Sequence, residues 1–463
     1  MRKTLALLLS GAFLFLALSP STSIESRAAA ATGKFQTVAN PIPNRYVVVL
    51  ATTDLSPIAA PAPTPKAVNP TDTQALVAPA MTMSSAANMT TDFAAIAVMP
   101  ADDPQVVATA TSLTATYGGT FSTTWGVALK GFLLNATEAQ AISMSNDSRV
   151  AFVVQDGAIA VGTPDGDPIV MTIDPNVDNI PQPNASWGLD RIDQRSLPLD
   201  SLYAYQNNGQ GVNAYIIDTG ILSTHAEFQG RAFGIYDALE REGTAVDCNG
   251  HGTHVAGIIG GRTFGVAKKV QLFAVRVLDC QGTGAWSNVI DGVNFVTWHH
   301  SQSSQQGVPA VANMSLAGST NRAAEAAVRN SIRSQVTYVV AAGNGNSDAQ
   351  YYSPAAVAEA ITVGATDRND ARAEFSNYGA TLDLFAPGVS ITSAWIGGDL
   401  MIATATGTSM AAPHVAGVVA QYLQTHRAAA PADVRSAVVG NATSGVVGNA
   451  GQESPNGLLF TNY

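Results

Sequence analysis

Three short segments carry residue types that together can perform nucleophilic catalysis. Asp218 ends the apolar run YII, His251 lies in the sequence NGHGTH, and Ser409 lies in GTSMAAPHVAG. A serine hydroxyl is a weak nucleophile until an imidazole removes its proton, and a carboxylate must hold that imidazole in the correct tautomer. The segments supply all three groups, in the order Asp, His, Ser, and so predict a site for serine nucleophilic chemistry.

Each of these residues also has a purely structural interpretation. An aspartate at the end of a strand can be a turn residue, and the GTS sequence can be a helix N-cap. His254 and His414 can be structural histidines, and spacing alone does not decide between His251 and His254 as the base. It is the presence of all three segments together that favours catalysis.

A zinc site is the main alternative from another class of chemistry. Cys248, His251 and His254 are spaced three residues apart, so a helix through them would present three metal ligands on one face. Gly250 and Gly252 disfavour such a helix, and the histidines lack the glutamate of a metalloprotease motif. We therefore expect serine chemistry without a catalytic cofactor, with a zinc-dependent hydrolase as the alternative.

The elements that must position these residues follow an alternating pattern from residue 187 onward. Short apolar runs without polar alternation, typical of strands buried on both faces of a parallel sheet, are separated by helix-like segments. We expect strands at 215–217, 270–278, 336–342 and 360–365, and helices at 288–300, 322–335, 410–424 and from Pro431. This order predicts a doubly wound α/β fold with its sites at the carboxyl ends of the strands.

The first 185 residues have a different organisation. Residues 1–30 resemble a secretory signal, with an end between about residues 19 and 31; their apolar stretch is short for a bilayer span, and a membrane anchor is the alternative. Residues 31–161 suggest a small α+β module, with strands at 46–50, 129–133 and 149–154, a helix at 137–142 and an Ala/Pro-rich insertion over 51–110. Residues 162–185 are typical of a linker suited to cleavage, and 186–463 form the main domain.

Composition and charge narrow the possible functions. With 46% apolar and 12% charged residues, the 463-residue chain can build a large core. Its net charge of −11 disfavours nucleic acid as a partner, because phosphate binding needs clustered Lys and Arg. Cys248 and Cys280 are a candidate disulfide in an exported protein, with two separate thiols as the alternative.

The motifs resemble those of the subtilase family of serine proteases, and most closely its proteinase K and aqualysin group. The similar segments are WGLDRIDQR from Trp187, DCNGHGTH from Asp247, VRVLDC from Val275, ANMSL from Ala312, AAGN from Ala341, FSNYG from Phe375 and SPNGL from Ser454. The resemblance extends over nearly all of residues 187–463. It implies that Asp218 orients His251, that His251 rather than His254 is the general base, that Ser409 is the nucleophile, and that Asn344 stabilises the oxyanion.

The resemblance also implies a substrate cleft, a disulfide and calcium sites. The cleft residues are Gly282, Gly284 and Trp286 on one side, and Ser315, Leu316, Ala317 and Gly318 on the other. Trp286 is expected as an apolar rim, with a plain core residue as the alternative, and Ala317 stands where the family usually has glycine. Cys248 and Cys280 match the aqualysin-type bridge, while Ile361 and Ala380 replace a second one. Asp383, with backbone carbonyls near Ala358 and Ala360, resembles one calcium site, and Asp190, Asp193 and Gln194 resemble another.

The N-terminal module resembles a subtilisin-type propeptide, which implies an intramolecular chaperone and inhibitor that is removed by autocleavage. The whole sequence therefore predicts a secreted, monomeric endopeptidase, made as a zymogen, that acts on proteins and peptides. A preference for apolar or aromatic residues before the scissile bond is expected, with calcium in a structural role. A catalytically inactive binding protein is a second alternative.

Overall fold

The computed structural model describes residues 33–51, 102–241 and 244–463. The expected signal at 1–30 and most of the expected insertion lie outside the described residues. Within the described ranges, no helix is long and apolar enough to cross a membrane.

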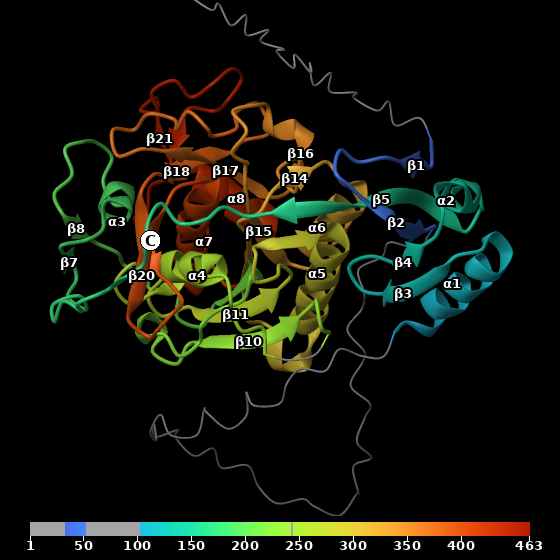
Figure 1. Cartoon of the computed structure of the whole chain (residues 1–463). Helices are drawn as coiled ribbons and strands as arrows, with labels where there is room; N and C mark the ends of the chain where they lie inside the picture. The colour runs from blue at the N-terminus through green and yellow to red at the C-terminus, as the bar shows by residue number, and fades with distance from the viewer. Residues whose placement is uncertain (1–32, 52–101, 242–243) are drawn as a thin grey trace, which may run out of the picture.

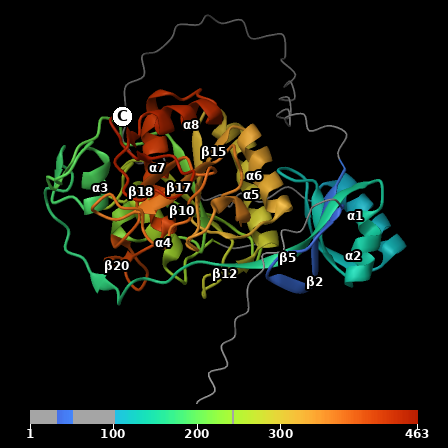
Figure 2. The same ribbon diagram turned by 90° about the horizontal axis from the view of Figure 1, so that it is seen from above.

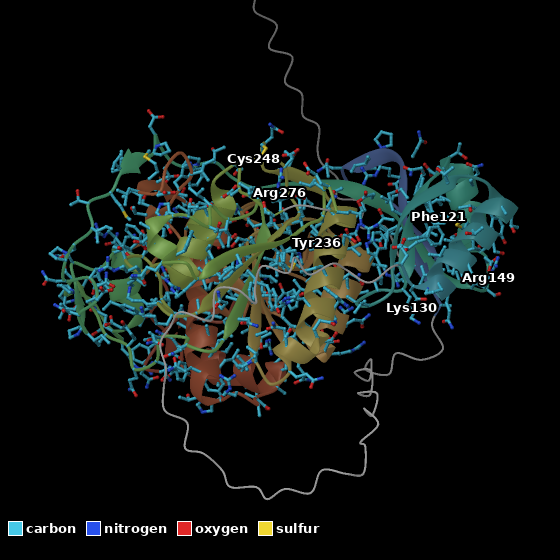
Figure 3. The ribbon with its side chains drawn as sticks, turned by 90° about the horizontal axis from the view of Figure 1, so that it is seen from below. Phe121, Lys130, Arg149, Tyr236, Cys248 and Arg276 are labelled. Carbon is cyan, nitrogen blue, oxygen red and sulfur yellow. A yellow bond between two sulfur atoms is a disulfide. The ribbon has the colours of Figure 1, made fainter. Side chains whose placement is uncertain are left out.

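A small α+β domain precedes the larger part of the molecule and lies at one side of it (Figure 1). Its elements are β1 (Phe35–Gln36), β2 (Pro41–Leu50), α1 (Pro104–Tyr117), β3 (Thr120–Trp125), β4 (Gly131–Asn135), α2 (Glu138–Ser145) and β5 (Val150–Ala160). The strands form one sheet in the order β1-β5-β2-β4-β3. Figure 3 labels Phe121, Lys130 and Arg149 in this domain, and Tyr236, Cys248 and Arg276 in the larger one.

Two elements of the small domain differ from the sequence prediction. Helix α1 includes residues 104–110, which the prediction assigned to the insertion, and β3 was not expected at all. Asp103 begins α1, because its side chain accepts hydrogen bonds from the backbone N–H groups of Gln105 and Val106. The helix was not predicted because the segment is rich in Ala and Thr, and only Val106, Ala110 and Leu113 of the helix are buried.

The larger part is built on a nine-stranded sheet in the order β10-β11-β9-β13-β15-β17-β18-β22-β21. Its strands are β9 (Asn213–Asp218), β10 (Ala232–Asp237), β11 (Gln271–Arg276), β13 (Ala310–Met314), β15 (Val336–Ala341), β17 (Ile361–Thr366), β18 (Leu384–Pro387), β21 (Thr443–Ser444) and β22 (Gly457–Leu458). All neighbours pair in parallel except β21 and β22.

Helices cover both faces of this sheet. They are α3 (Trp187–Ile192), α4 (His251–Gly260), α5 (Trp286–Ser301), α6 (Arg322–Arg333), α7 (Thr408–Thr425) and α8 (Pro431–Gly440). In β9, Ile216 belongs to the core shared with α4 and α7, whereas the next residue, Ile217, belongs to the core shared with α5 and α6. A strand buried on both faces needs apolar residues at every position, and this confirms the predicted doubly wound α/β fold.

The remaining strands are short and lie outside the main sheet. They are β6 (Ile169–Val170), β7 (Gln182–Pro183), β8 (Leu202–Tyr203), β12 (Thr283–Ala285), β14 (Gly318–Ser319), β16 (Tyr352–Ser353), β19 (Ile391–Ala394) and β20 (Met401–Ala405), with 3₁₀ turns at Ala226–Phe228, Ser303–Gln305 and Ala349–Tyr351. Strand β5 connects the two parts, because it pairs with β2 in the small domain and with β12 in the larger one. Figure 2 shows the chain leaving β5, passing β12 and continuing toward β20.

Candidate active site

The imidazole of His251 is held by Asp218 at the carboxyl end of the main sheet. Asp218 is the last residue of β9, and its Oδ1 lies 2.8 Å from Nδ1 of His251. Both residues are buried. Burial acts to lower the pKa of His251, but the charge of Asp218, its hydrogen bond and the charge of Asp247 together raise that pKa above its ordinary value. The pair is therefore arranged as a base and its orienting carboxylate.

Helix α4 begins at His251, in a stretch where the sequence analysis named no helix, and it leaves Cys248 outside, so no helix runs through Cys248, His251 and His254. Asp247 fixes this start. Its Oδ2 accepts the backbone N–H and the hydroxyl of Thr253, and its Oδ1 accepts the hydroxyl of Thr219 and the N–H of Gly250. The first turn of α4 thus has a carboxylate cap, which compensates for the low helix propensity of glycine.

Ser409 is the second residue of helix α7 and lies almost wholly buried beside this base. Its hydroxyl donates to the carbonyl oxygen of Ser315 at 2.9 Å. The hydroxyl of Ser315 donates in turn to the carbonyl oxygen of Ser409 at 2.7 Å, so the two serines are linked in both directions. Nε2 of His251 has no hydrogen-bond partner among the described residues, which leaves it available to the Ser409 hydroxyl after a side-chain rotation.

Asn344 presents its side-chain nitrogen to the same place. Its Oδ1 accepts both the backbone N–H of Thr408, at 2.9 Å, and the hydroxyl of Thr408, at 2.8 Å. The amide is thereby oriented with Nδ2 toward the site, next to the N-terminus of α7, where backbone N–H groups lack intrahelical acceptors. Sequence reasoning missed Thr408, although its place directly before the candidate nucleophile was a usable signal.

These side chains line one small pocket. Its lining residues are Gly162, Thr163, His251, Asn344, Trp395, Ala405, Thr406, Ser409 and Met410. Gly162 and Thr163 come from the segment that follows β5, far in sequence from the others. The pocket therefore brings the candidate nucleophile and base together with a stretch of the same chain.

The expected cleft segments flank the residues just before this stretch. Strand β12 pairs antiparallel with the end of β5, Thr283 opposite Ala160, and the N–H of Val161 donates to the Gly282 carbonyl at 2.9 Å. On the other side, Ala160 forms an antiparallel bridge with Ala317. A β-carbon on Gly282, whose φ is +72°, would lie 2.9 Å from Cγ2 of Val161, so the close approach requires glycine. The end of β5 thus lies as a central strand between two cleft walls.

Trp286 was expected as an apolar rim of the cleft, with a core residue as the alternative, and in this structure the small domain packs against it. It is the first residue of α5 and is fully buried, in the same core as Ile159 and Leu316. A β-carbon on Gly318 would lie 3.0 Å from its ring. With the small domain in place, Trp286 is a core residue beneath the cleft.

Cys248 and Cys280 form a disulfide with a Cα–Cα distance of 4.9 Å. Arg276 lies beside it, with its guanidinium 3.5 Å from Sγ of Cys248. A bonded Cys248 is not free to ligate zinc together with His251 and His254. Over the ranges that the structure describes, no group of three or more His, Cys, Asp or Glu side chains could hold a metal ion.

The calcium site expected at Asp383, with carbonyl groups near Ala358 and Ala360, does not fit the structure. Oδ2 of Asp383 accepts the backbone N–H of Thr362 at 2.8 Å, and Oδ1 is paired with the guanidinium of Arg435. Arg435 thus supplies the positive charge that a metal would bring. Sequence reasoning missed this partner because it lies 52 residues further along the chain, on α8.

The second expected group is a loop of oxygen-rich residues around α3. Asp190 accepts the N–H groups of Asp200 and Ser201, and Asp193 accepts that of Ala204. Nε2 of Gln194 donates to two backbone carbonyls, those of Ser196 and Pro198. Burial, followed by the charges of Asp190 and Asp200, raises the pKa of Asp193 to about 7.

Comparisons with known proteins identify a family and several relatives. The family model described as "Subtilase family" matches residues 209–458. The chain is 51% identical over 339 residues to an extracellular serine proteinase of Thermus sp. (strain Rt41A), covering 73% of this chain and 76% of that one. It is 46% identical over 289 residues to proteinase R of Parengyodontium album, covering 62% and 72%. A crystal structure of a cold adapted subtilisin-like serine proteinase, 47% identical, superposes with a TM-score of 0.57 and covers 60% of this chain and 99% of that one.

Proposed function

Because the chain belongs to the subtilase family of serine proteases, we propose that Asp218, His251 and Ser409 are its catalytic triad and Asn344 its oxyanion donor. The observation that carries the proposal is that Ser409, His251 and Asn344 line the same pocket. Gly162 and Thr163, from the segment that follows β5, line it too. The protein is a serine endopeptidase. Its Thermus relative is named an extracellular proteinase, and we place this protein outside the cell as well. It takes protein and peptide substrates and needs no cofactor for the chemical step.

The geometry gives each residue a step in peptide hydrolysis. His251, held through Nδ1 by Asp218, removes the Ser409 proton with Nε2 once the hydroxyl turns away from Ser315. The freed Oγ attacks the carbonyl carbon of the substrate. Nδ2 of Asn344 and the backbone N–H of Ser409 then stabilise the negative oxygen. His251 passes its proton to the departing amine, and water, activated by the same base, hydrolyses the acyl-enzyme.

We also propose that the small domain is a propeptide and that the first cut falls between Gly162 and Thr163. Residues 158–161 fill the cleft as a strand between β12 and Ala317, and Gly162 and Thr163 follow them into the pocket beside Ser409. This position lies within the linker expected at 162–185. On this assignment residues 31–162 form the propeptide, and the mature enzyme begins with a short N-terminal tail before α3.

The propeptide makes contacts that suit both an inhibitor and a folding aid. Asp156, which is buried, accepts the backbone N–H of Ser287 at 3.0 Å and its hydroxyl at 2.7 Å, at the first turn of α5. Arg45 pairs with the same carboxylate at 2.9 Å. Oδ1 of Asn294, on α5, accepts the N–H groups of Val127 and Ala128. The propeptide therefore supports α5 while its last residues block the cleft.

We further propose a structural calcium ion at Asp190, Asp193 and Gln194, and none at Asp383. The side chains of Asp190, Asp193 and Gln194 can all offer oxygen ligands, which suit a hard cation. A bound calcium would neutralise the carboxylates of this loop. It has no part in the chemistry, because base and oxyanion donors all come from side chains and backbone of the pocket.

The substrate preference follows from the cleft. Residues 158–161 bind mainly through backbone groups, so specificity is broad, with the apolar walls favouring apolar or aromatic side chains before the scissile bond. Mass spectrometry of casein digests tests this preference. A strict requirement for a charged residue before the bond would contradict it.

The deciding experiment compares the full chain with the Ser409→Ala variant, each purified without other proteases. We expect the unaltered chain to cut itself before Thr163 and then to hydrolyse casein, and the variant to remain intact. A serine-directed reagent should abolish hydrolysis, whereas a zinc chelator should not. A correctly cut Ser409→Ala chain would contradict autoprocessing, and a folded but inactive unaltered chain would favour a binding protein instead.

A further inference from the structure

The segment that follows the cut has contacts that the proposed triad chemistry does not use. Downstream of Thr163, the N–H of Asp165 donates to the carbonyl of Thr404 at 2.8 Å. Strand β6 then pairs antiparallel with β20, with Ile169 opposite Ile402 and Val170 opposite Met401. The N–H of Met171 donates to the carbonyl of Leu400 at 2.8 Å. The chain beyond the scissile bond thus lies along β20 from Asp165 to Met171.

Without this segment β20 would be an edge strand. Its only other neighbour in the described sheet is β19, so the side that faces β6 would present unpaired backbone N–H and C=O groups. Such an edge binds an extended peptide by adding it as a strand. Ile169 and Val170 are 63% and 68% exposed, so their side chains add little apolar burial. The pairing therefore depends on backbone groups, which any extended peptide can supply.

One side chain adds selectivity to this backbone pairing. The hydroxyl of Thr406 accepts the backbone N–H of Ser390 at 2.9 Å, and donates its own proton to Oδ2 of Asp165 at 2.6 Å. Because the hydroxyl accepts the Ser390 N–H with its oxygen, its own proton is free for an acceptor at the place of Asp165. A carboxylate is the strongest acceptor for it. With the cut before Thr163, Asp165 is the third residue after the scissile bond.

We propose that β20 and Thr406 form an extended binding surface for the part of a substrate that follows the scissile bond, selective for a carboxylate three residues after it. This inference rests on the proposed function and on the cut between Gly162 and Thr163. In the precursor the surface is filled by residues 165–171 of the chain itself. In the mature enzyme the same surface binds the leaving half of a substrate, in competition with that tail.

The test uses internally quenched peptides and the mature enzyme. One peptide copies residues 158–170, AIAVGTPDGDPIV, and its partner carries Ala at the place of Asp165. Because both peptides compete with the same tail, the tail cancels from the ratio of their kcat/KM values. We expect the Asp peptide to be preferred about threefold to tenfold at low salt, since an exposed hydrogen bond to a charged group is of modest strength.

Two variants assign the preference to Thr406. Thr406→Ser keeps the hydroxyl and should keep the ratio, whereas Thr406→Val keeps the shape without the hydroxyl and should bring the ratio close to one. A third peptide that ends at the glycine after Asp, AIAVGTPDG, removes the residues of β6 that pair with β20 and keeps only the contact of Asp165. We expect its kcat/KM to fall at least threefold below that of the longer peptide.

The outcomes separate this inference from the proposed function. Peptides that stay uncut, are cut elsewhere than between Gly and Thr, or are cut despite a serine-directed reagent would contradict the proposed function. Peptides that are cut at that bond with equal kcat/KM for Asp and Ala, or with a preference that survives in Thr406→Val, would overturn the role of Thr406. Equal values for the long and the short peptide would overturn the role of β20.

Discussion

The side chain of Asn344 is oriented by Thr408, whose backbone N–H and hydroxyl both donate to its Oδ1. An amide held by its oxygen at two points keeps its nitrogen aimed at the site without reorganisation during the reaction. With Asn344 as the oxyanion donor that we propose, Thr408 is a positioning residue that acts through Asn344.

This arrangement predicts the effect of Thr408→Val. The variant loses one of the two anchors of Asn344, and we expect kcat to fall about tenfold with little change in KM, because the oxyanion exists only after attack. Asn344→Ala, which removes the donor itself, should cost roughly 10² to 10³ in kcat. Thr408→Ser keeps the hydroxyl and serves as the control. Steady-state kinetics that show a rise in KM with unchanged kcat would contradict a positioning role.

The second prediction concerns pH. As the base that we propose, His251 must be neutral to accept a proton, so kcat/KM should rise with pH through its pKa. The charge and hydrogen bond of Asp218, with the charge of Asp247, outweigh burial and raise that pKa, which moves the rising limb to higher pH than for an ordinary histidine. Asp218→Asn should move the limb to lower pH and reduce kcat roughly 10⁴-fold. An unmoved limb in that variant would show that another group titrates.

The third prediction concerns the small domain that we propose to be a propeptide. Asp156→Ala removes the cap that the small domain provides to α5 and leaves Arg45 without this partner. We expect the refolding chain to mature about tenfold more slowly, since losing an N-cap costs about 1 kcal/mol and the lost ion pair adds to it. Electrophoresis of timed samples measures the conversion. Asp167→Ala, in an exposed segment, is the matched control and should mature at the normal rate.

The fourth prediction concerns Asp383. Arg435→Ala leaves a buried carboxylate that keeps only its bond to Thr362, and we expect a loss of about 2 kcal/mol in the free energy of unfolding. The estimate is modest because Arg435 is 40% exposed. Arg435→Lys should recover part of the loss. A full recovery of Arg435→Ala by calcium in thermal unfolding would show that this site prefers a metal after all.

The fifth prediction concerns calcium at the loop around α3. Calcium that binds only the folded state stabilises it by mass action, about 2.7 kcal/mol at a hundredfold excess over Kd. A chelator should therefore shorten the half-life on heating while initial rates at low temperature stay unchanged. Asp193→Asn should remove most of this calcium dependence. A prompt, calcium-reversible loss of rate at low temperature, with circular dichroism unchanged, would place the metal in the reaction instead.

Much of the fold could be predicted from the sequence because the patterns that indicate strands and helices lie within short stretches of chain. Strands such as β15 are continuous apolar runs, and their burial on both faces leaves no other explanation for the pattern. Helix α4 was missed because glycine precedes it at 250 and recurs within it at 252, 257 and 260. Its stability comes from complete burial and from the Asp247 cap, neither of which a local pattern contains.

The candidate site also has features that the sequence predicts and features that depend on tertiary contacts. Chemistry selects Ser, His and Asp, but the choice of His251 over His254 depends on which imidazole reaches Asp218, and that is a tertiary fact. His254 instead lies against the carbonyls of Ile391 and Ala403. The pairing of Asp383 with Arg435 and the contact of Asp165 with Thr406 join residues 52 and 241 positions apart, for which the sequence offers no periodic signal.

Strand β5 belongs to two sheets at once, and this has a consequence for the time course of activity. Cutting the chain after Gly162 breaks a covalent bond but none of the hydrogen bonds that join β5 to β2 and β12. Activity should therefore appear only when the small domain dissociates or is itself digested. A few liberated molecules can destroy the propeptides of the others, so a population of cut chains should show a lag, then a steep, sigmoid rise whose delay shortens as protein concentration increases.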